Sequence, residues 1–188
     1  MPGADRVTKA PETFKEYVFD GWYDAATGGN KVTSFDASSL KAGKENAFYA
    51  HFKEVLKKFT VTWDANGGKF TNGNSEAAKQ YEYGSYIKVA SVGENPTRTT
   101  DAQYEYTFAG WYQTTDGSGV DYSEKFQTIT NDVTFYAHYT KIPRAYSVTL
   151  HANDGILAEG NNITKYTYGT PVTLPEPTKE GYNFGGWY

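Results

Sequence analysis

Aromatic residues and glycines recur along the chain in one short pattern that reads Y-x-F-x-G-W-Y. Successive side chains of a strand point to opposite faces. If each copy is a regular strand, the first tyrosine and the phenylalanine share one face and the tryptophan takes the other. In the middle copy this rule places the side chains of Phe108 and Trp111 on opposite faces of the strand. The three copies are Tyr17–Tyr23, Tyr106–Tyr112 and Tyr182–Tyr188.

A second pattern precedes the later copies and predicts another strand. Phe59–Gly68 matches Tyr146–Gly155 in order and in residue type. Apolar residues alternate with threonine and aspartate from position 59 to 65, as in a strand with one buried face. Asn66–Gly68 then supplies residues that adopt positive φ in a tight turn.

Three further matches complete the repeating unit. Tyr81–Val89 resembles Tyr166–Leu174 and predicts a strand with a glycine near its start. A Pro-Thr-Lys/Arg turn then leads into the Y-x-F-x-G-W-Y strand, and an F-Y-A-H-F/Y segment follows it as a closing strand. The turns are Pro96–Arg98 and Pro177–Lys179, and the closing strands are Phe48–Phe52 and Phe135–Tyr139.

These matches predict one complete repeat and two partial ones. We assign 57–142 to a complete repeat, 1–56 to the second half of a preceding repeat and 143–188 to the first half of a following one. More residues separate Pro96 from Phe108 than Pro177 from Phe184. We place this excess at Thr99–Gln103 as an insertion in a surface loop.

Composition favours a β-rich fold. Aromatic residues make up 17% of the chain, tyrosine alone occurs 17 times, and glycine 19 times. Tyrosine, threonine and valine favour strands, and glycines favour the turns between them. We expect an α+β, β-rich fold of tandem small repeats. Two segments, Lys31–Leu40 and Tyr122–Ile129, could each form a short helix or an irregular turn.

Charge and cysteine content limit the classes of function. The net charge is −4 and the lysines and arginines are dispersed, which argues against nucleic-acid binding. The chain has no cysteine, so disulfides and thiolate metal sites are excluded. No run approaches the ~18 apolar residues of a membrane span, so we expect no membrane insertion. The first six residues lack the apolar core of a signal peptide.

The ordered set of motifs resembles the internalin B-repeat, or Listeria–Bacteroides repeat, family. The motifs run V-T-x-x-A-N-G-G, Y-G, P-T-K/R, Y-x-F-x-G-W-Y and F-Y-A-H-F/Y, and they cover nearly the whole chain. The resemblance implies a small β-grasp-like fold similar to ubiquitin or SUMO. It also implies an extracellular repeat of bacterial surface proteins, found as a stalk or beside adhesins and secreted enzymes. The family has no catalytic residues to transfer.

The motif aromatic residues are the candidate contacts for a ligand or partner. Large aromatic rings can form stacking platforms for sugars, but a ring that recurs behind a glycine in every unit is more often part of a core. We favour packing and keep ligand contact as the alternative. The candidates are Trp22, Trp111, Trp187, Tyr23 and Tyr112.

The remaining polar motifs predict neither catalysis nor a metal or cofactor site. His51 and His138 occupy the same position of the closing strand without the partners that a zinc site needs. Asp116–Glu124 has acidic residues around glycines but departs from the calcium-loop pattern. No nucleophile elbow or H-E-x-x-H motif occurs. Carboxylate pairs for glycoside hydrolysis depend on spatial distance and stay open.

We expect a non-enzymatic extracellular module that acts as a spacer, stalk or adhesion unit on a bacterial cell surface. The alternative is a carbohydrate-binding module beside a secreted glycan-active enzyme. Expected partners are neighbouring repeats and, for an adhesion unit, a host or cell-surface protein or glycan. The complementary half-repeats at the two ends further predict head-to-tail self-association.

Overall fold

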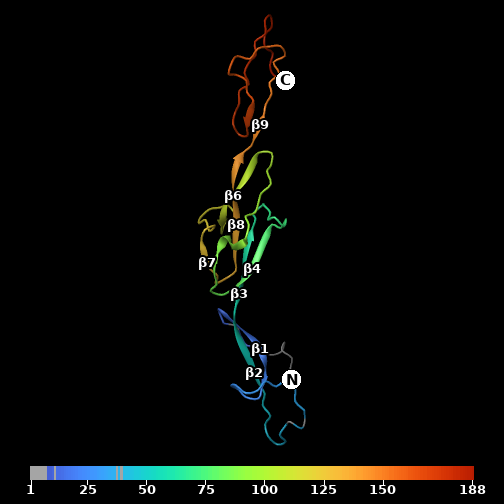
Figure 1. The fold of residues 1–188 in the computed structure, drawn as a ribbon, viewed down its shortest axis with the longest axis vertical. Coiled ribbons are helices and arrows are strands. Elements are labelled where there is room, and N and C mark those ends of the chain that lie inside the picture. The colour runs from blue at the N-terminus through green and yellow to red at the C-terminus, as the bar shows by residue number, and fades with distance from the viewer. Residues whose placement is uncertain (1–7, 11, 37, 39) are drawn as a thin grey trace. The chain divides into compact units, whose positions relative to one another are not determined.

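The computed structural model of the chain describes residues 8–10, 12–36, 38 and 40–188, and these form a β-rich structure (Figure 1). The predicted β-rich class is confirmed. Within the described residues the helical content is one four-residue 3-10 turn, η2 (Val89–Val92). The strands are β1 (Lys15–Tyr23), β2 (Tyr49–Leu56), β3 (Lys58–Asp64), β4 (Glu76–Glu82), β5 (Tyr86–Lys88), β6 (Tyr104–Tyr112), β7 (Phe126–Thr128), β8 (Val133–Pro143), β9 (Ala145–Ser147) and β10 (Lys165–Thr167).

The strands form one four-stranded sheet, of order β4-β3-β8-β6, and three two-stranded sheets, β1-β2, β5-β7 and β9-β10. Contacts between Cα atoms divide the chain into two compact units. The first comprises the described residues up to 62 with 78–88 and 126–134, and the second comprises 63–77, 89–125 and 135–188. The three-part division into 1–56, 57–142 and 143–188 stays a prediction.

The first unit contains the β1-β2 hairpin and the β5-β7 pair. The hairpin is antiparallel and runs from Lys15 opposite Leu56 to Tyr23 opposite Tyr49. In the β5-β7 pair, Ile87 lies opposite Gln127. The backbone N–H of Gly84 donates to the carbonyl of Ile129 at 2.7 Å. The buried apolar residues of this unit are Val61, Ile87 and Ile129.

The second unit holds most of the buried aromatic residues. Trp63 is 2% exposed, and its indole N–H donates to the carbonyl of Val89 at 2.8 Å. Each aromatic ring of this kind buries roughly 150–250 Å², so a few rings can form an interior in a chain poor in aliphatic residues. The buried apolar side chains of this unit are those of Trp63, Ala65, Phe70, Val89, Pro96, Trp111, Phe135, Ala137 and Tyr139.

Several strand predictions are confirmed. The alternation from residue 59 to 65 corresponds to β3, in which Val61 is fully buried, and the predicted closing strands correspond to β2 and β8. Asn66 and Gly67 both adopt positive φ, as the turn prediction requires. Each residue of the predicted insertion at Thr99–Gln103 is exposed.

Three predictions need correction. Tyr81–Val89 is not one strand, because β4 ends at Glu82, Gly84 turns the chain with φ +80°, and β5 starts at Tyr86. Tyr122–Ile129 adopts the turn alternative and then forms β7. Tyr182–Tyr188 carries the motif but forms no strand. In the other two copies the motif strand pairs with a closing strand, β1 with β2 and β6 with β8.

The predicted lack of a signal peptide concerns residues 1–6, which lie outside the described residues. Positions 37 and 39, within the segment Lys31–Leu40, also lie outside them. The described part of that segment contains no α-helix.

A β-bulge overturns the predicted alternation within the motif. In the β6-β8 ladder Phe108 lies opposite Tyr139, Gly110 opposite His138, and Trp111 opposite Ala137, with a register shift between Phe108 and Gly110. One extra residue on β6 changes the phase of the strand. Phe108 and Trp111 therefore lie on the same face. The β1-β2 ladder has the same shift between Phe19 and Gly21.

The bulge predicts that Gly110→Ala destabilises the protein by about 3 kcal/mol. Gly110 has φ +151°, and a Cβ there would lie 2.8 Å from Asp121 Oδ1. Gly73 provides the matched control, because its φ is +84° and nothing lies within 4 Å of the added Cβ. Gly73→Ala should cost about 1 kcal/mol. Urea unfolding followed by tryptophan fluorescence measures both, and equal losses would contradict the role assigned to the bulge.

Candidate functional site

Trp111 is enclosed by aromatic rings. It is 0% exposed, and its ring stacks on Phe70 at 6.3 Å with a 17° interplanar angle. Phe108 meets it edge-on at 5.4 Å and 62°. The buried indole N–H has no hydrogen-bond partner within the described part of the chain, which costs about 1–3 kcal/mol. Trp111 therefore serves the interior and offers no surface to a ligand.

The phenylalanine–tryptophan contact is repeated in all three copies. Phe19 meets Trp22 at 5.9 Å and 68°, and Phe184 meets Trp187 at 5.7 Å and 66°. Trp22 and Trp187 are each part-buried, in contrast to the fully buried tryptophan of the middle copy. The indole N–H of Trp187 donates to the carbonyl of Pro175 at 2.9 Å. The structure thus gives each motif the same internal pair but different degrees of cover.

The last tyrosine of the motif packs on the histidine of the closing strand. Tyr23 stacks on His51 at 4.0 Å and 10°, and Tyr112 meets His138 edge-on at 5.6 Å and 67°. His51 Nε2 lies 2.9 Å from the carbonyl oxygen of Ala25. Among the described residues no group of three histidine, aspartate or glutamate side chains is placed to hold a metal ion.

A basic side chain lies over the first tyrosine of every motif copy. Lys9 Nζ is 3.6 Å from the ring centre of Tyr17, and Lys179 Nζ is 5.1 Å from that of Tyr182. In the middle copy the guanidinium carbon of Arg98 is 4.2 Å from the Tyr106 ring centre. Such contacts contribute about 0.5–1 kcal/mol at exposed sites. In the second and third copies the signal in the sequence was the basic residue that ends the Pro-Thr-Lys/Arg turn, whereas Lys9 follows a threonine with no proline before it.

An ionic cluster in the first copy was not predicted from the sequence. Asp20 occupies the bulge position of β1, and its carboxylate lies 2.7 Å from Lys53 Nζ and 3.8 Å from Lys31 Nζ. The hydroxyl of Tyr23 donates to the same carboxylate at 2.5 Å. The hydrogen bonds from Lys53 and Tyr23 lower the pKa of Asp20 to about 2. In the middle copy the bulge position is Ala109, so the cluster is specific to the first copy.

The loop Asp116–Glu124 uses its carboxylates to hold its own backbone. Asp116 accepts the backbone N–H of Ser118 at 2.9 Å, and this bond is the main cause that lowers the pKa of Asp116 to about 2. Asp121 accepts the backbone N–H of Ser123 at 2.8 Å. These are the local bonds that aspartate forms in turns. Both carboxylates are therefore engaged within their own loop.

Tyr139 connects the closing strand β8 to the turn after β3. Its hydroxyl donates to the carbonyl of Ala65 at 2.9 Å, and its ring meets Phe108 edge-on at 6.2 Å. The side-chain amide of Asn66 donates to the carbonyl of Ala137 at 2.9 Å. Burial raises the pKa of Tyr139 to about 12. The interior of the second unit therefore depends on β8 lying against this turn.

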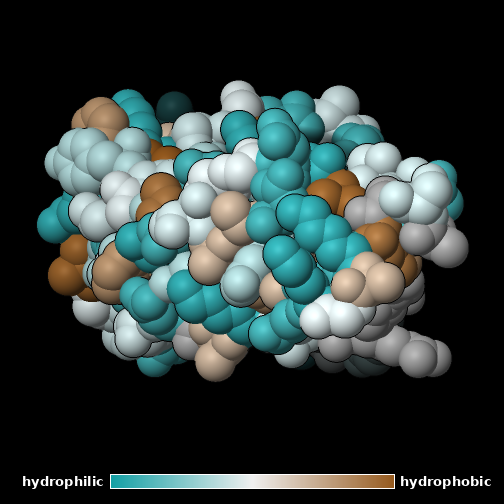
Figure 2. All heavy atoms as spheres, turned by 90° about the horizontal axis from the view of Figure 1, so that it is seen from below, coloured by the Kyte–Doolittle hydropathy of each residue, from teal (hydrophilic) through white to brown (hydrophobic). Residues whose placement is uncertain are grey.

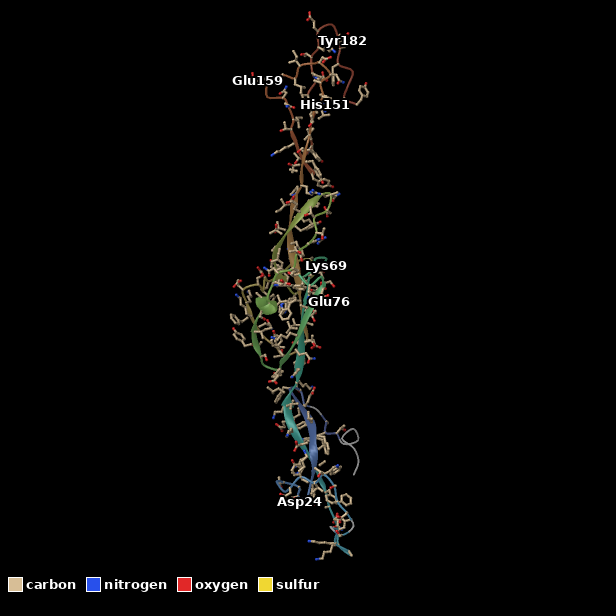
Figure 3. All side chains as sticks on the ribbon, turned by 45° about the vertical axis from the view of Figure 1, so that its right-hand side comes forward. Asp24, Lys69, Glu76, His151, Glu159 and Tyr182 are labelled. Atoms are coloured by element: carbon tan, nitrogen blue, oxygen red, sulfur yellow. The ribbon has the colours of Figure 1, made fainter. Side chains whose placement is uncertain are left out.

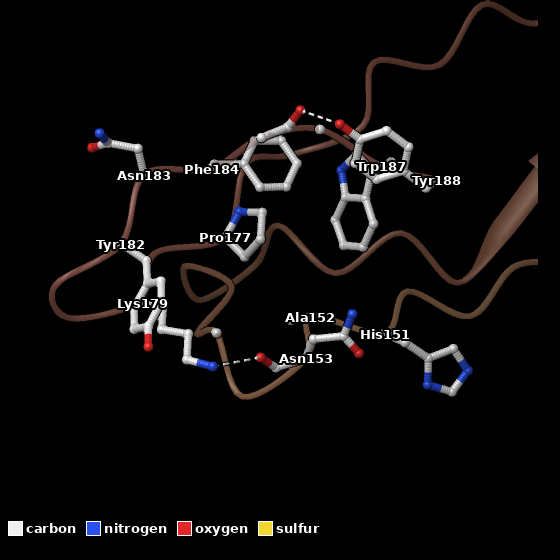
Figure 4. Close-up of a pocket in the computed structure, with 13 residues that line it drawn as sticks. His151, Ala152, Asn153, Pro177, Lys179, Tyr182, Asn183, Phe184, Trp187 and Tyr188 are labelled. Carbon is white, nitrogen blue, oxygen red and sulfur yellow. Dashed lines mark hydrogen bonds between the residues drawn. The ribbon is translucent and has the colours of Figure 1, made fainter.

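The C-terminal segment contains a hollow of about 340 Å³ (Figure 4). Its walls include His151, Asn153 and Trp187. Tyr188 donates from its hydroxyl to the carbonyl of Gly185 at 2.8 Å, and Lys179 Nζ donates to the carbonyl of Asn153 at 3.2 Å. His151 and Tyr182 are labelled on this segment in Figure 3.

The fold and these contacts define a β-rich repeat whose aromatic motif forms its interior. Comparison with known proteins identifies the family of this repeat. The model of the Listeria-Bacteroides repeat domain matches residues 4–51, 59–138 and 146–188. The chain belongs to this family, and the predicted resemblance is confirmed.

Bacterial surface-type proteins are among the relatives. A protein of Evansella cellulosilytica that carries the provisional name Gly-rich membrane protein is 30% identical over 179 residues, which is 92% of this chain and 19% of that protein. Internalin H of Listeria monocytogenes is 34% identical over 143 residues, which is 74% of this chain and 22% of that protein. The chain thus spans about a fifth of the length of these relatives. The search among solved structures found no match.

No helix within the described residues has the length and apolar character to cross a membrane. The names of the two Evansella cellulosilytica relatives describe membrane proteins.

The difference in cover between the tryptophans gives a copy-by-copy prediction. Trp111→Ala should destabilise the protein by about 3–5 kcal/mol, because it removes a fully buried ring from a filled interior. Trp22→Ala should cost no more than about half as much, since its ring is already partly in water. Urea midpoints followed by circular dichroism compare the two. A larger loss for Trp22→Ala would contradict the packing described here.

The raised pKa of Tyr139 leads us to expect that the folded protein loses stability at alkaline pH. Its folded pKa of about 12 lies above the ordinary value near 10, so its contribution is complete below about pH 10 and is lost as the pH rises toward 12. The substitution Tyr139→Phe introduces the residue type that the first copy has at the equivalent position, Phe52. It should be about 1 kcal/mol less stable at pH 8, through the lost hydrogen bond.

The difference in stability between wild type and Tyr139→Phe should then close and reverse sign at pH 11.5, because ionisation of Tyr139 in the unfolded chain destabilises only the wild type, by about 2 kcal/mol. Urea unfolding at both pH values measures it. A gap that stays constant would exclude Tyr139 as the titrating group.

Proposed function

We propose that the chain acts as a structural repeat of a bacterial surface protein, a spacer or stalk that presents other domains outside the cell and takes part in adhesion through its neighbours. In this proposal the unit is non-enzymatic and β-grasp-like. The adjacent central positions of β3 and β8, the first and last strands of the complete repeat, support the fold assignment.

The burial of Trp111 carries the proposal. A stacking platform for a ligand needs an exposed ring, and this ring is 0% exposed between Phe70 and Phe108. The same phenylalanine–tryptophan contact in the other copies supports a motif devoted to packing. Hydrophilic and hydrophobic residues are interspersed on the face drawn in Figure 2. Such a surface suits a spacer.

Carbohydrate binding is the competing function. The partial exposure of Trp22 and Trp187 favours it, because a sugar could reach the exposed part of either ring. Each ring already packs on a phenylalanine of its own motif, and Tyr23 is covered by His51. These contacts favour the spacer.

The spacer role predicts that soluble oligosaccharides leave the tryptophan fluorescence of the full chain unchanged. The titration uses a panel of neutral and amino-sugar oligosaccharides, with Trp22→Phe and Trp187→Phe as matched variants. A saturating change that one of these variants removes would establish glycan binding and overturn the proposal.

A further inference from the structure

The inserted loop, Thr99–Gln103, is closed by an acidic residue in the same way as its counterpart in the first copy. Asp101 accepts the hydroxyl of Tyr106 at 2.6 Å, and Glu12 accepts the hydroxyl of Tyr17. The backbone N–H of each acid donates to the carbonyl three positions later, at 3.1 Å in the middle copy and 3.0 Å in the first. In both copies the first motif tyrosine follows the basic residue that lies over it by eight positions, and in the third copy by three. The loop is therefore a feature that two copies share.

Three successive carbonyls of the loop accept hydrogen bonds from the segment that follows β8. The carbonyls of Asp101 and Gln103 accept the guanidinium and the backbone N–H of Arg144, at 2.9 Å and 3.0 Å respectively. The carbonyl of Ala102 accepts the hydroxyl of Tyr146. All of these residues belong to the second compact unit. Because the loop uses its backbone for these bonds, they depend on its conformation more than on its side chains.

A single connecting residue makes the same two backbone bonds in both copies. Lys57 alone separates β2 from β3, and Arg144 alone separates β8 from β9. The N–H of Lys57 donates to the loop carbonyl of Phe14 at 3.1 Å, as the N–H of Arg144 does to its own loop. The carbonyl of Lys57 accepts the N–H of Tyr83 at 2.7 Å, and that of Arg144 accepts the N–H of Tyr168 at 2.8 Å. The connecting residue thus joins the loop of one repeat to a tyrosine of the next.

The ring of that tyrosine also packs on the preceding repeat. The ring centres of Tyr83 and Phe14 are 5.8 Å apart, and Tyr168 meets Tyr104 edge-on at 5.4 Å and 73°. Each tyrosine precedes a glycine with φ +80°, so both belong to the Y-G motif of their repeat. Aromatic pairs of this kind contribute beyond the area that they bury.

The two loops make these contacts with different sequences. Residues 10–14 read A-P-E-T-F and residues 99–103 read T-T-D-A-Q, so the acid at the third position is their common feature. An insertion that a surface merely tolerates has no reason to keep the same bonds to the next repeat in two copies.

We propose that the inserted loop is a docking site, and that its occupant is the repeat that follows in the chain, bound through its connecting residue and the tyrosine of its Y-G motif. The inference rests on the proposed spacer function, in which neighbouring repeats are the partners. Adjacent repeats then stabilise one another through this contact. The length of the loop determines the coupling, because a copy with the short spacing of the third lacks the residues that supply these carbonyls.

Amide hydrogen exchange of the full ¹⁵N-labelled chain tests the proposal, because it reports each junction bond separately. The N–H groups of Arg144 and Tyr168 should exchange at least about tenfold more slowly than in an unfolded chain. Asp101→Ala removes the acid that closes the loop and should speed both about fivefold relative to the N–H of Ala137 in β8. Asp116→Ala is the matched control, since that carboxylate holds a different loop, and it should leave both rates unchanged.

Two further variants change the loop contact itself. Tyr146→Phe introduces the residue type of the first copy, Phe59, and removes the hydroxyl bond to the loop, so Arg144 should exchange about threefold faster. Deletion of Thr99–Gln103 gives the middle copy the spacing of the third and should abolish the protection of the junction amides. The indole signal of Trp111 shows whether the complete repeat is still folded. If the deletion variant does not fold, the point variants decide the outcome.

Three results would overturn the proposal. The first is exchange of Arg144 and Tyr168 at unfolded-chain rates in the wild type, and the second is equal acceleration by Asp101→Ala and Asp116→Ala. The third is full protection of the junction amides in a folded deletion variant. Exchange at the junction reports docking whether or not a glycan binds, and the glycan titration does not depend on the loop. Failure of the docking proposal is therefore distinguishable from failure of the spacer proposal.

Discussion

A strand with unbroken alternation would put Phe108 and Trp111 on opposite faces, and no single interior could contain both rings. The extra residue between Phe108 and Gly110 brings them together on the side of β8 that carries Ala137 and Tyr139. Phe70 then completes the enclosure of the tryptophan. On this face Phe108 also meets the ring of Tyr139, whose hydroxyl donates to the carbonyl of Ala65 in the turn after β3. The glycine after the bulge is the residue that allows this arrangement, because its backbone conformation disfavours a side chain.

The sequence predicted local features well where one segment determines them. The alternation from 59 to 65 identified β3, and the Asn-Gly-Gly run identified the turn at Asn66. The alternation of residue types alone could not locate the bulge. One extra residue in a strand reverses the face on which each later side chain lies, but it leaves the types of residue in the motif unchanged. The glycine before each tryptophan was the available signal, because glycine inside a strand often marks a bulge. The third motif copy forms no strand, although its sequence predicts one. A strand needs a hydrogen-bonded neighbour, and that neighbour is not part of the motif itself.

In the candidate site, too, contacts set by the local sequence could be predicted and contacts set by tertiary structure could not. In the second and third copies the basic residue over the first tyrosine of the motif could have been predicted from the short Pro-Thr-Lys/Arg turn. The ionic cluster of Asp20 could not, because Lys53 lies on the partner strand β2 and meets the carboxylate only once the register is known. The burial of Trp111 likewise depends on Phe70, which reaches it from a loop far away in the sequence. Tertiary contacts of this kind decide whether one motif yields a covered ring or a partly open one.

The bulge glycine is covered by a different side chain in each of two copies. A Cβ at Gly21 would lie 2.4 Å from Lys31 Cε, and one at Gly110 would lie 2.8 Å from Asp121 Oδ1. The same β-bulge therefore lies beneath a cation, Lys31, in the first copy and beneath an anion, Asp121, in the middle copy. The outer charge of a repeat can therefore reverse sign without disturbing the aromatic packing inside. Successive units built on one interior can in this way present surfaces of opposite polarity to whatever lies beside them.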